Sequence, residues 1–202
     1  MTMLVNKISL LLLILISTEC ISQDNIRKDV RDVTKLTFLN PGLTYEKRIG
    51  KLQTLYTQTF LSTAIYLGYS DALGNMSSIN FHPALTLQYR YYYNATKRES
   101  KGKRIEMNSM NYISARVETN FYKETISYTG EKELRNSKIF GVAWGFQRNY
   151  PKRFSLDMSL GLGYVFIKKT SLNELGEFVT KNVGEFTDLV QINLGFWLNK
   201  RN

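Results

Sequence analysis

The chain has 202 residues and a formal net charge of +10, from 27 Lys and Arg residues against 17 Asp and Glu residues. Its single cysteine, Cys20, excludes a disulfide framework and a thiolate metal site. The high aromatic content, 13 Tyr and 11 Phe, beside only 3 Pro favours a sheet-rich domain.

Residues 1–22 have the features of a secretory signal peptide. Lys7 precedes an apolar run, Ile8–Ile16, which is shorter than the roughly 20 residues that a membrane-spanning helix needs. Cys20 and Ser22 then form the small-x-small pattern of a signal peptidase site. We predict a mature chain that starts at Gln23, with a short lead-in over 23–32 and one β domain over 33–202.

Cys20 also allows a lipoprotein interpretation, in which cleavage precedes an acylated cysteine. Glu19 disfavours it, because such sites usually have a small residue at that position.

Segments of about ten residues with a period of two follow from residue 33, separated by turn-rich or charged connections. The first predicted strand covers 33–46 and is interrupted at Pro41 and Gly42, where a proline implies a bulge or an irregular edge. The second covers 55–69. The remaining predicted strands are 84–93, 112–122, 140–147, 154–166 and 190–198.

The strand over 154–166 alternates most clearly: Phe154, Leu156 and Met158 begin one face, and Ser155 and Asp157 begin the other. In the predicted strands over 84–93, 112–122 and 154–166, charged side chains fall on one face only.

Seven strands are visible, whereas a single-chain bacterial membrane barrel has an even number and a minimum of about eight. Two segments are candidates for the missing strand. One is Gly176–Phe186, and the other is a division of the first strand at Asn40, Pro41 and Gly42. Strand parity does not choose between them.

We therefore predict an all-β fold, a closed antiparallel up-and-down transmembrane β-barrel of about eight strands with its apolar face outward. The opposite face is small and polar with few charges, which suits a narrow lumen. Charges in a lumen must pair, so we predict pairing among Arg90, Arg116, Glu118 and Asp157 between neighbouring strands. The alternative is the solvated face of a soluble sheet.

Aromatic residues near the strand ends suggest girdles at the headgroup level of a membrane. The predicted girdle residues are Tyr91, Tyr92, Tyr93, Tyr112, Tyr122, Tyr150, Phe154, Phe196 and Trp197.

The segments FLNPGLTYEKRIGKLQTL, LQYRYYYN and LVQINLGFWLNK, together with the signal peptide, resemble small outer-membrane β-barrel proteins of Gram-negative bacteria. The resemblance covers most of the mature chain and implies an outer-membrane location, but it supplies no catalytic residues. Many such barrels end on an aromatic residue that the outer-membrane assembly machinery reads. Here Phe196 and Trp197 are followed by five more residues.

His82, the one histidine, is the centre of an enzymatic alternative in which Ser77 or Ser78 at the rim would act on lipid A or phospholipid. No acidic residue lies at a sequence spacing that would identify it as a catalytic partner of His82, so a structural role for His82 is favoured. The scattered carboxylates Glu174, Glu177, Glu185 and Asp188 form no recognisable metal-ligand set, and no cofactor is predicted.

The strongest local charge signal is a basic connection that contains Lys97, Arg98, Lys101, Lys103 and Arg104. These side chains either contact lipid phosphates or form a solvated turn. Nucleic acid is disfavoured as a partner, because the chain is exported and has no nucleic-acid-binding motif.

The expected function is that of a non-enzymatic outer-membrane barrel with a structural or loop-mediated binding role, a lumen filled by side chains and no wide pore. The alternatives are the lipid-modifying enzyme centred on His82 and a soluble periplasmic barrel that binds an apolar ligand. Expected partners are outer-membrane lipids, the assembly machinery and an unidentified protein.

Orientation follows if both termini are periplasmic. The connections 47–51, 151–153 and 95–110 would then face the periplasm, and loops 71–79, 124–138 and 169–187 would be extracellular. If Gly176–Phe186 adds a strand, the upstream assignments reverse and the basic connection lies outside the cell.

Overall fold

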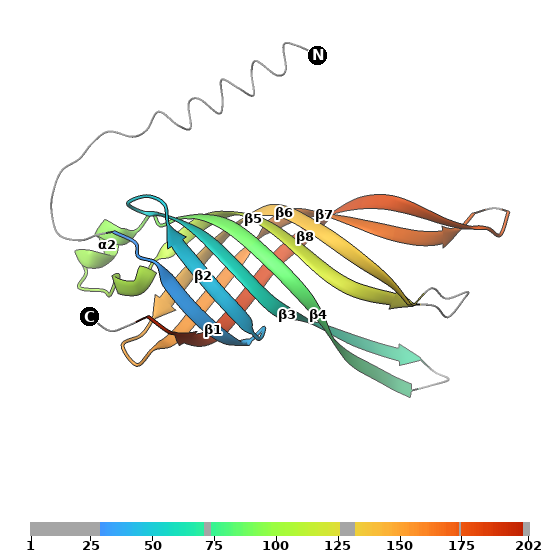
Figure 1. Ribbon diagram of the computed structural model, residues 1–202, viewed down its shortest axis with the longest axis horizontal. Helices are drawn as coiled ribbons and strands as arrows, with labels where there is room; N and C mark the ends of the chain where they lie inside the picture. The colour runs from blue at the N-terminus through green and yellow to red at the C-terminus, as the bar shows by residue number, and fades with distance from the viewer. Residues whose placement is uncertain (1–28, 71–73, 126–131, 174, 200–202) are drawn as a thin grey trace, which may run out of the picture.

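The computed structural model describes residues 29–70, 74–125, 132–173 and 175–199. Its sheet has eight strands, each antiparallel to its neighbour in sequence, and the first also pairs with the last, so the sheet closes on itself (Figure 1). The strands are β1 (Val33–Leu39), β2 (Gly42–Arg48), β3 (Gln53–Ser70), β4 (Gly74–Tyr91), β5 (Asn111–Thr125), β6 (Lys132–Asn149), β7 (Phe154–Leu172) and β8 (Phe178–Trp197).

The prediction of an all-β fold with eight antiparallel strands in a closed sheet is confirmed. The eighth strand comes from the division of the first predicted strand, because a turn at Asn40 and Pro41 separates β1 from β2. Asn40 adopts a φ of 55°, and the Thr37 hydroxyl donates a 2.8 Å hydrogen bond to its carbonyl. The expected bulge or irregular edge lies just before the proline: the β1–β8 register shifts between Thr37 and Leu39, whereas Pro41 itself lies in the turn and removes no ladder hydrogen bond.

The other candidate, residues 176–186, adds no separate strand, because it comprises the end of a turn and the first part of β8. Because β1 and β2 are separate strands, the chain enters and leaves the sheet at the same end: the first residues of β1 lie beside the last residues of β8. The connections 49–52, 92–110 and 150–153 lie at that same end, which we call the α2 end after the short helix α2 (Ala95–Glu99) (Figure 1).

Three long hairpins extend the closed sheet at the opposite end. Of β4, only Ala84–Tyr91 pairs with β5, whereas Gly74–Pro83 pairs with β3 alone. The β5–β6 and β7–β8 hairpins extend in the same way (Figure 1). Most described residues of the expected long loops over 71–79, 124–138 and 169–187 therefore belong to strands, and residues 71–73, 126–131 and 174 lie outside the described part of the chain. The alternation of these segments was too weak to recognise without the partner strands.

The α2 end is covered by the segment between β4 and β5, which holds α2 and the 3₁₀ helix η1 (Glu106–Asn108). A small apolar core forms there from Val30, Tyr92, Ala95, Met110 and Tyr112. The lead-in before β1 is tied to this cover by two 2.8 Å hydrogen bonds between the Asn108 side chain and the Arg31 backbone. No helix in the described part of the chain combines the length and apolar character needed to cross a membrane.

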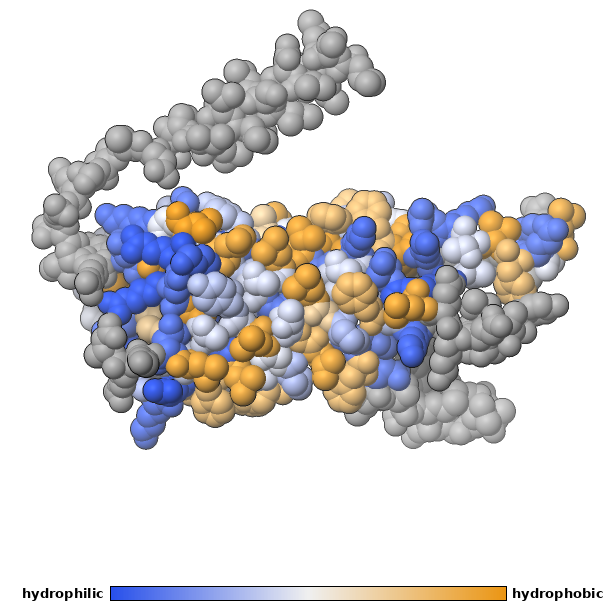
Figure 2. Space-filling view, viewed as in Figure 1, coloured by the Kyte–Doolittle hydropathy of each residue, from blue (hydrophilic) through white to orange (hydrophobic). Residues whose placement is uncertain are grey.

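The polarity of the closed sheet is inverted relative to a water-soluble domain. Among the described residues, buried polar and charged side chains outnumber buried hydrophobic ones. Large hydrophobic side chains instead cover the outer face, for example Val142 at 62% exposure and Leu162 at 66%. Figure 2 shows hydrophobic side chains over the middle of the closed sheet and hydrophilic ones gathered at the α2 end.

Part of the predicted aromatic girdle is wrong. Tyr92, Tyr112 and Trp197 are buried, whereas Tyr91, Tyr93, Tyr150 and Phe196 are exposed. The alternation of side chains explains the difference. Tyr92 follows Arg90 of β4 by two positions, so both side chains point inward. Nearness to a strand end does not determine which face a side chain occupies.

Candidate functional site

The interior nearest the α2 end holds four buried charged residues, which we call the α2-end cluster: Lys35 (β1), Glu46 (β2), Arg90 (β4) and Asp157 (β7). Arg90 Nη1 lies 2.8 Å from Asp157 Oδ2, and Lys35 Nζ lies 3.7 Å from the same oxygen. One carboxylate therefore faces two cations.

Two tyrosine rings hold the Arg90 guanidinium from either side. Its central carbon lies 3.5 Å from the ring centre of Tyr56 and 4.1 Å from that of Tyr112. The Tyr112 hydroxyl also donates a 2.7 Å hydrogen bond to Asp157 Oδ1. Because an aromatic face attracts a cation, both the plane and the edge of the guanidinium are stabilised.

Glu46 is satisfied by neutral donors. It accepts hydrogen bonds from the Tyr92 hydroxyl at 2.5 Å, from Thr54 Oγ1 at 2.7 Å and from Gln147 Nε2 at 3.1 Å. Gln147 also accepts hydrogen bonds from Lys35 and Arg90, so its amide links Glu46 to the cations. The four charges therefore form one connected network, which a low-dielectric interior requires.

A second charged pair, Arg116 and Glu118, lies farther along the interior. Both residues belong to β5, two positions apart, and both point inward. Glu118 also accepts hydrogen bonds from Thr86 Oγ1 at 2.6 Å and from Asn120 Nδ2 at 3.1 Å. Arg116 Nε and Nη1 are buried without a hydrogen-bond partner among the described residues.

The structure thus brings the four predicted interior charges together as Arg90 with Asp157 and Arg116 with Glu118. The expectation that pairs would join neighbouring strands is wrong. The first pair reaches across the interior from β4 to β7, and the second stays within one strand. A closed sheet of about eight strands is narrow enough for a long side chain to span it.

Lys35 and Glu46 belong to the interior network but were not among the predicted site residues. Leu36 and Phe38 are exposed on the outer face, which assigns Lys35 to the inner face. Treating β1 and β2 as one interrupted strand concealed that alternation.

The basic connection forms the wall of a pocket of about 320 Å³ at the α2 end. Lys97, Arg98, Lys101 and Lys103 line it, together with Arg148 from the end of β6. Arg104, the fifth predicted basic residue, lies outside this lining and forms a 2.9 Å ion pair with Glu106. Sequence spacing could not include Arg148, because it is 44 or more positions from the other cations.

His82 lies within β4, not at the start of a strand, since β4 begins at Gly74. Its ring packs edge-on against Tyr122, with 6.0 Å between ring centres. In the part of the chain that the structure describes, His82 makes no ion pair with a carboxylate. The side chains of Ser77 and Ser78 lie outside the described residues.

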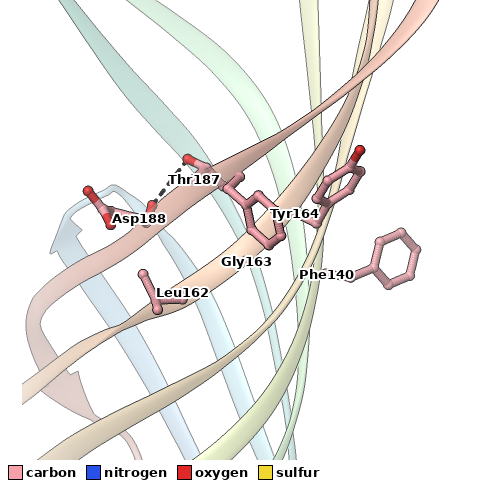
Figure 3. Close-up of a pocket in the computed structure, with 7 residues that line it drawn as sticks. Phe140, Leu162, Gly163, Tyr164, Thr187 and Asp188 are labelled. Carbon is pink, nitrogen blue, oxygen red and sulfur yellow. Dashed lines mark hydrogen bonds between the residues drawn. The ribbon is translucent and has the colours of Figure 1, made fainter.

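An apolar groove of about 500 Å³ lies on the outer face where β6, β7 and β8 meet. Figure 3 shows Phe140, Leu162 and Tyr164 around it, with Thr187 and Asp188 as the polar residues of its lining. Its walls suit an apolar group such as a hydrocarbon chain.

The described residues contain no group of three or more His, Cys, Asp or Glu side chains arranged to hold a metal ion. No family model, no curated protein and no solved structure matches this chain significantly.

Proposed function

We propose that this chain is a non-enzymatic outer-membrane β-barrel protein with a structural or loop-mediated binding role. In this proposal residues 1–22 direct export, the closed sheet spans the bilayer, and binding takes place at its ends. Outer-membrane lipids and the assembly machinery are the proposed partners.

The observation that carries the proposal is the inverted polarity of the closed sheet. On β7, Leu160 and Leu162 are 61% and 66% exposed, whereas the inward-pointing Asp157 is 3% exposed. A soluble monomer rarely exposes a continuous apolar surface of more than a few hundred Å². A bilayer removes such a surface from water, with about 1.5–3 kcal/mol gained for each large side chain that becomes fully buried.

The polar interior argues against a soluble barrel that binds an apolar ligand. Such a barrel lines its cavity with apolar side chains and turns its charges to water. Here Gln58, Gln88, Gln191 and Asn193 fill the interior beside the α2-end cluster and hydrogen-bond to one another. Those amides and charges would not favour an apolar ligand.

Exposed aromatic side chains at the α2 end support a membrane boundary there. Trp144 Nε1 donates a 2.7 Å hydrogen bond to the Tyr93 hydroxyl on the outer face. Trp144 and Phe146 also lie close together, with 6.2 Å between ring centres. Amphipathic rings of this kind favour the interface between hydrocarbon and water.

The filled interior supports a role without a wide channel. An open channel would leave inward-pointing side chains exposed to water. The inward-pointing side chains here are at most 1% exposed in the case of Arg90, Tyr56, Gln58 and Gln88. Open channels need barrels of about sixteen strands. We expect no conductance above leak when the protein is reconstituted in a planar bilayer.

We also propose that the α2 end is periplasmic, because two of its three connections, 49–52 and 150–153, are short and the three long hairpins extend the sheet at the opposite end. A matched pair of glycines tests both location and orientation. Gly102 lies at the α2 end and Gly176 in the β7–β8 turn; both have a positive φ, 61° and 78°, and an added Cβ meets nothing within 4 Å at either. Gly102→Cys and Gly176→Cys are therefore matched: each places a side chain at a positive φ, and neither meets a steric clash.

Each variant is expressed in a Gram-negative host and treated with a membrane-impermeant thiol reagent. We expect Gly176→Cys to label in intact cells and Gly102→Cys to label only after the outer membrane is permeabilised. The reverse pattern would overturn the orientation. Recovery of both proteins with the soluble periplasmic contents would overturn the membrane location.

A further inference from the structure

The basic pocket at the α2 end concentrates positive charge. Its lining includes Lys97, Arg98, Lys101, Lys103 and Arg148, and no carboxylate. Within the described part of the chain, none of these five cations forms an ion pair with an acidic side chain. Like charges in one pocket repel, so this arrangement favours an anion as occupant.

Neutral acceptors hold both arginines in place. Arg98 donates from Nε and Nη2 to the Arg104 carbonyl at 3.2 and 3.0 Å. Arg148 donates to the carbonyls of Met110 and Gln147 at 3.0 and 2.7 Å, and to Asn111 Oδ1 at 2.7 Å. Partial burial lowers the pKa of Arg98, and no carboxylate offsets that effect. Both guanidiniums keep further N–H donors for a ligand.

The pocket borders the outer aromatic side chains of the closed sheet. Tyr93 lines the pocket and accepts the hydrogen bond from Trp144. Arg148 lies over the ring of Phe146, with 5.1 Å between its central carbon and the ring centre. The cationic lining is therefore continuous with the apolar outer face, which extends to Ile113 and Val142.

We propose that this pocket binds the phosphate group of an anionic membrane lipid, whose acyl chains lie along the outer face of β4, β5 and β6. Guanidinium groups suit phosphate oxygens because they offer paired donors in one plane. The aromatic border distinguishes a lipid from free phosphate as the ligand, since only a lipid uses both surfaces. The proposal rests on the membrane location proposed above.

The two tryptophans of the chain supply a test. Trp144 is 47% exposed beside the pocket, whereas Trp197 is 3% exposed inside the sheet. The protein is reconstituted in phosphatidylcholine vesicles that contain a fixed minor fraction of phosphatidylglycerol. Bromine atoms, which quench tryptophan fluorescence on contact, are placed on the acyl chains of either lipid in turn, and Trp144→Phe assigns the quenched signal.

We expect brominated phosphatidylglycerol to quench Trp144 more strongly than its fraction of the bilayer lipid predicts. The excess should correspond to an enrichment of phosphatidylglycerol around Trp144 of roughly fivefold or more. Arg98→Gln with Arg148→Gln should abolish that excess. Lys97→Gln with Lys101→Gln should reduce it, and these exposed side chains make no hydrogen bonds on which the described fold depends. The matched control is Lys51→Gln with Lys152→Gln, which removes two charges from the same end outside the pocket and should retain the excess.

Three results would overturn the lipid site while leaving the membrane location intact. They are quenching by each brominated lipid in proportion to its share of the bilayer, loss of the excess in the control as well, and displacement by inorganic phosphate at matched ionic strength, which would assign the pocket to the free anion. Absence of quenching by either lipid would instead overturn the membrane location.

Discussion

The α2-end cluster and the Arg116–Glu118 pair are two solutions to burying charge in the same closed sheet. In the cluster, Asp157 faces two cations and a tyrosine hydroxyl, and Arg90 lies between two aromatic rings. In the pair, Arg116 has one carboxylate partner, and two of its nitrogens, against one of Arg90's, are buried without hydrogen-bond partners among the described residues.

This difference predicts how strongly the stability of the closed sheet depends on each buried charge. In the closed part of the sheet, the buried cations Lys35, Arg90 and Arg116 face the buried anions Glu46, Glu118 and Asp157. A fourth buried cation among the described residues, Arg135, lies in the β5–β6 hairpin beyond it. Removing a shared partner leaves several buried charges uncompensated, whereas removing a partner from a pair leaves one. The cluster should therefore respond more strongly than the pair to a single neutral substitution.

Asp157→Asn should have the largest effect, because it removes the carboxylate that Arg90 and Lys35 share and leaves Glu46, which reaches them through Gln147, as the remaining anion of the cluster. We expect a loss of about 3–5 kcal/mol in the free energy of unfolding, measured by urea titration of the protein in lipid vesicles. Adding Arg90→Gln should recover part of that loss, since it removes one of the stranded charges. A loss no larger than that of Glu118→Gln would contradict the comparison.

Glu118→Gln should have an intermediate effect. The substitution keeps an amide that can accept from Thr86 but removes the charge opposite Arg116, so we expect a loss of about 1–3 kcal/mol in the same titration. Glu118→Gln combined with Arg116→Gln should be closer to the unsubstituted protein than Glu118→Gln alone. If the double substitution is the worse of the two, the pair is not an independent unit.

Asp32, in the lead-in before β1, should have the smallest effect, because it lies outside the interior and its side chain is 38% exposed. Partial burial raises its pKa, but hydrogen bonds from the Lys47 side chain and the Arg48 backbone lower it, and the net pKa lies below the usual value.

A lowered pKa gives stability that is present above the unfolded value of about 3.9 and is lost as the pH falls through the folded value. Solvent screening limits this contribution to about 1 kcal/mol or less. Titrations from about pH 6 to about pH 3 should show that Asp32→Asn removes this part of the pH dependence. An unchanged pH profile would exclude Asp32 as its source.

The sequence predicted the closed all-β sheet because side-chain polarity has the same period as the strand. Residues 154–166 lie within β7 with their predicted faces, and Asp157 points inward as its parity requires. The turn at Asn40 and Pro41 was one of two open choices. The pairing of β1 with β2 across that turn resolves it.

The parts that the sequence did not predict depend on three-dimensional proximity. Arg90 meets Asp157 across the interior, and Arg148 joins the basic connection from another strand. Alternation gives the face of a residue but not the residue opposite it. Lys35 and Glu46 alternate with outward-facing neighbours, but this pattern was concealed while the turn at Asn40 and Pro41 remained one of two open choices.

Val142→Arg tests most directly whether the outer face contacts lipid, because Val142 is 62% exposed in the middle of that face. Leu175→Arg is the matched control, since Leu175 is 84% exposed in the β7–β8 turn beyond the closed sheet. In vesicles, we expect Val142→Arg to lower the free energy of unfolding by about 2–4 kcal/mol and Leu175→Arg to leave it within about 1 kcal/mol. Equal stability of the two variants would contradict the proposal that the closed sheet spans a membrane.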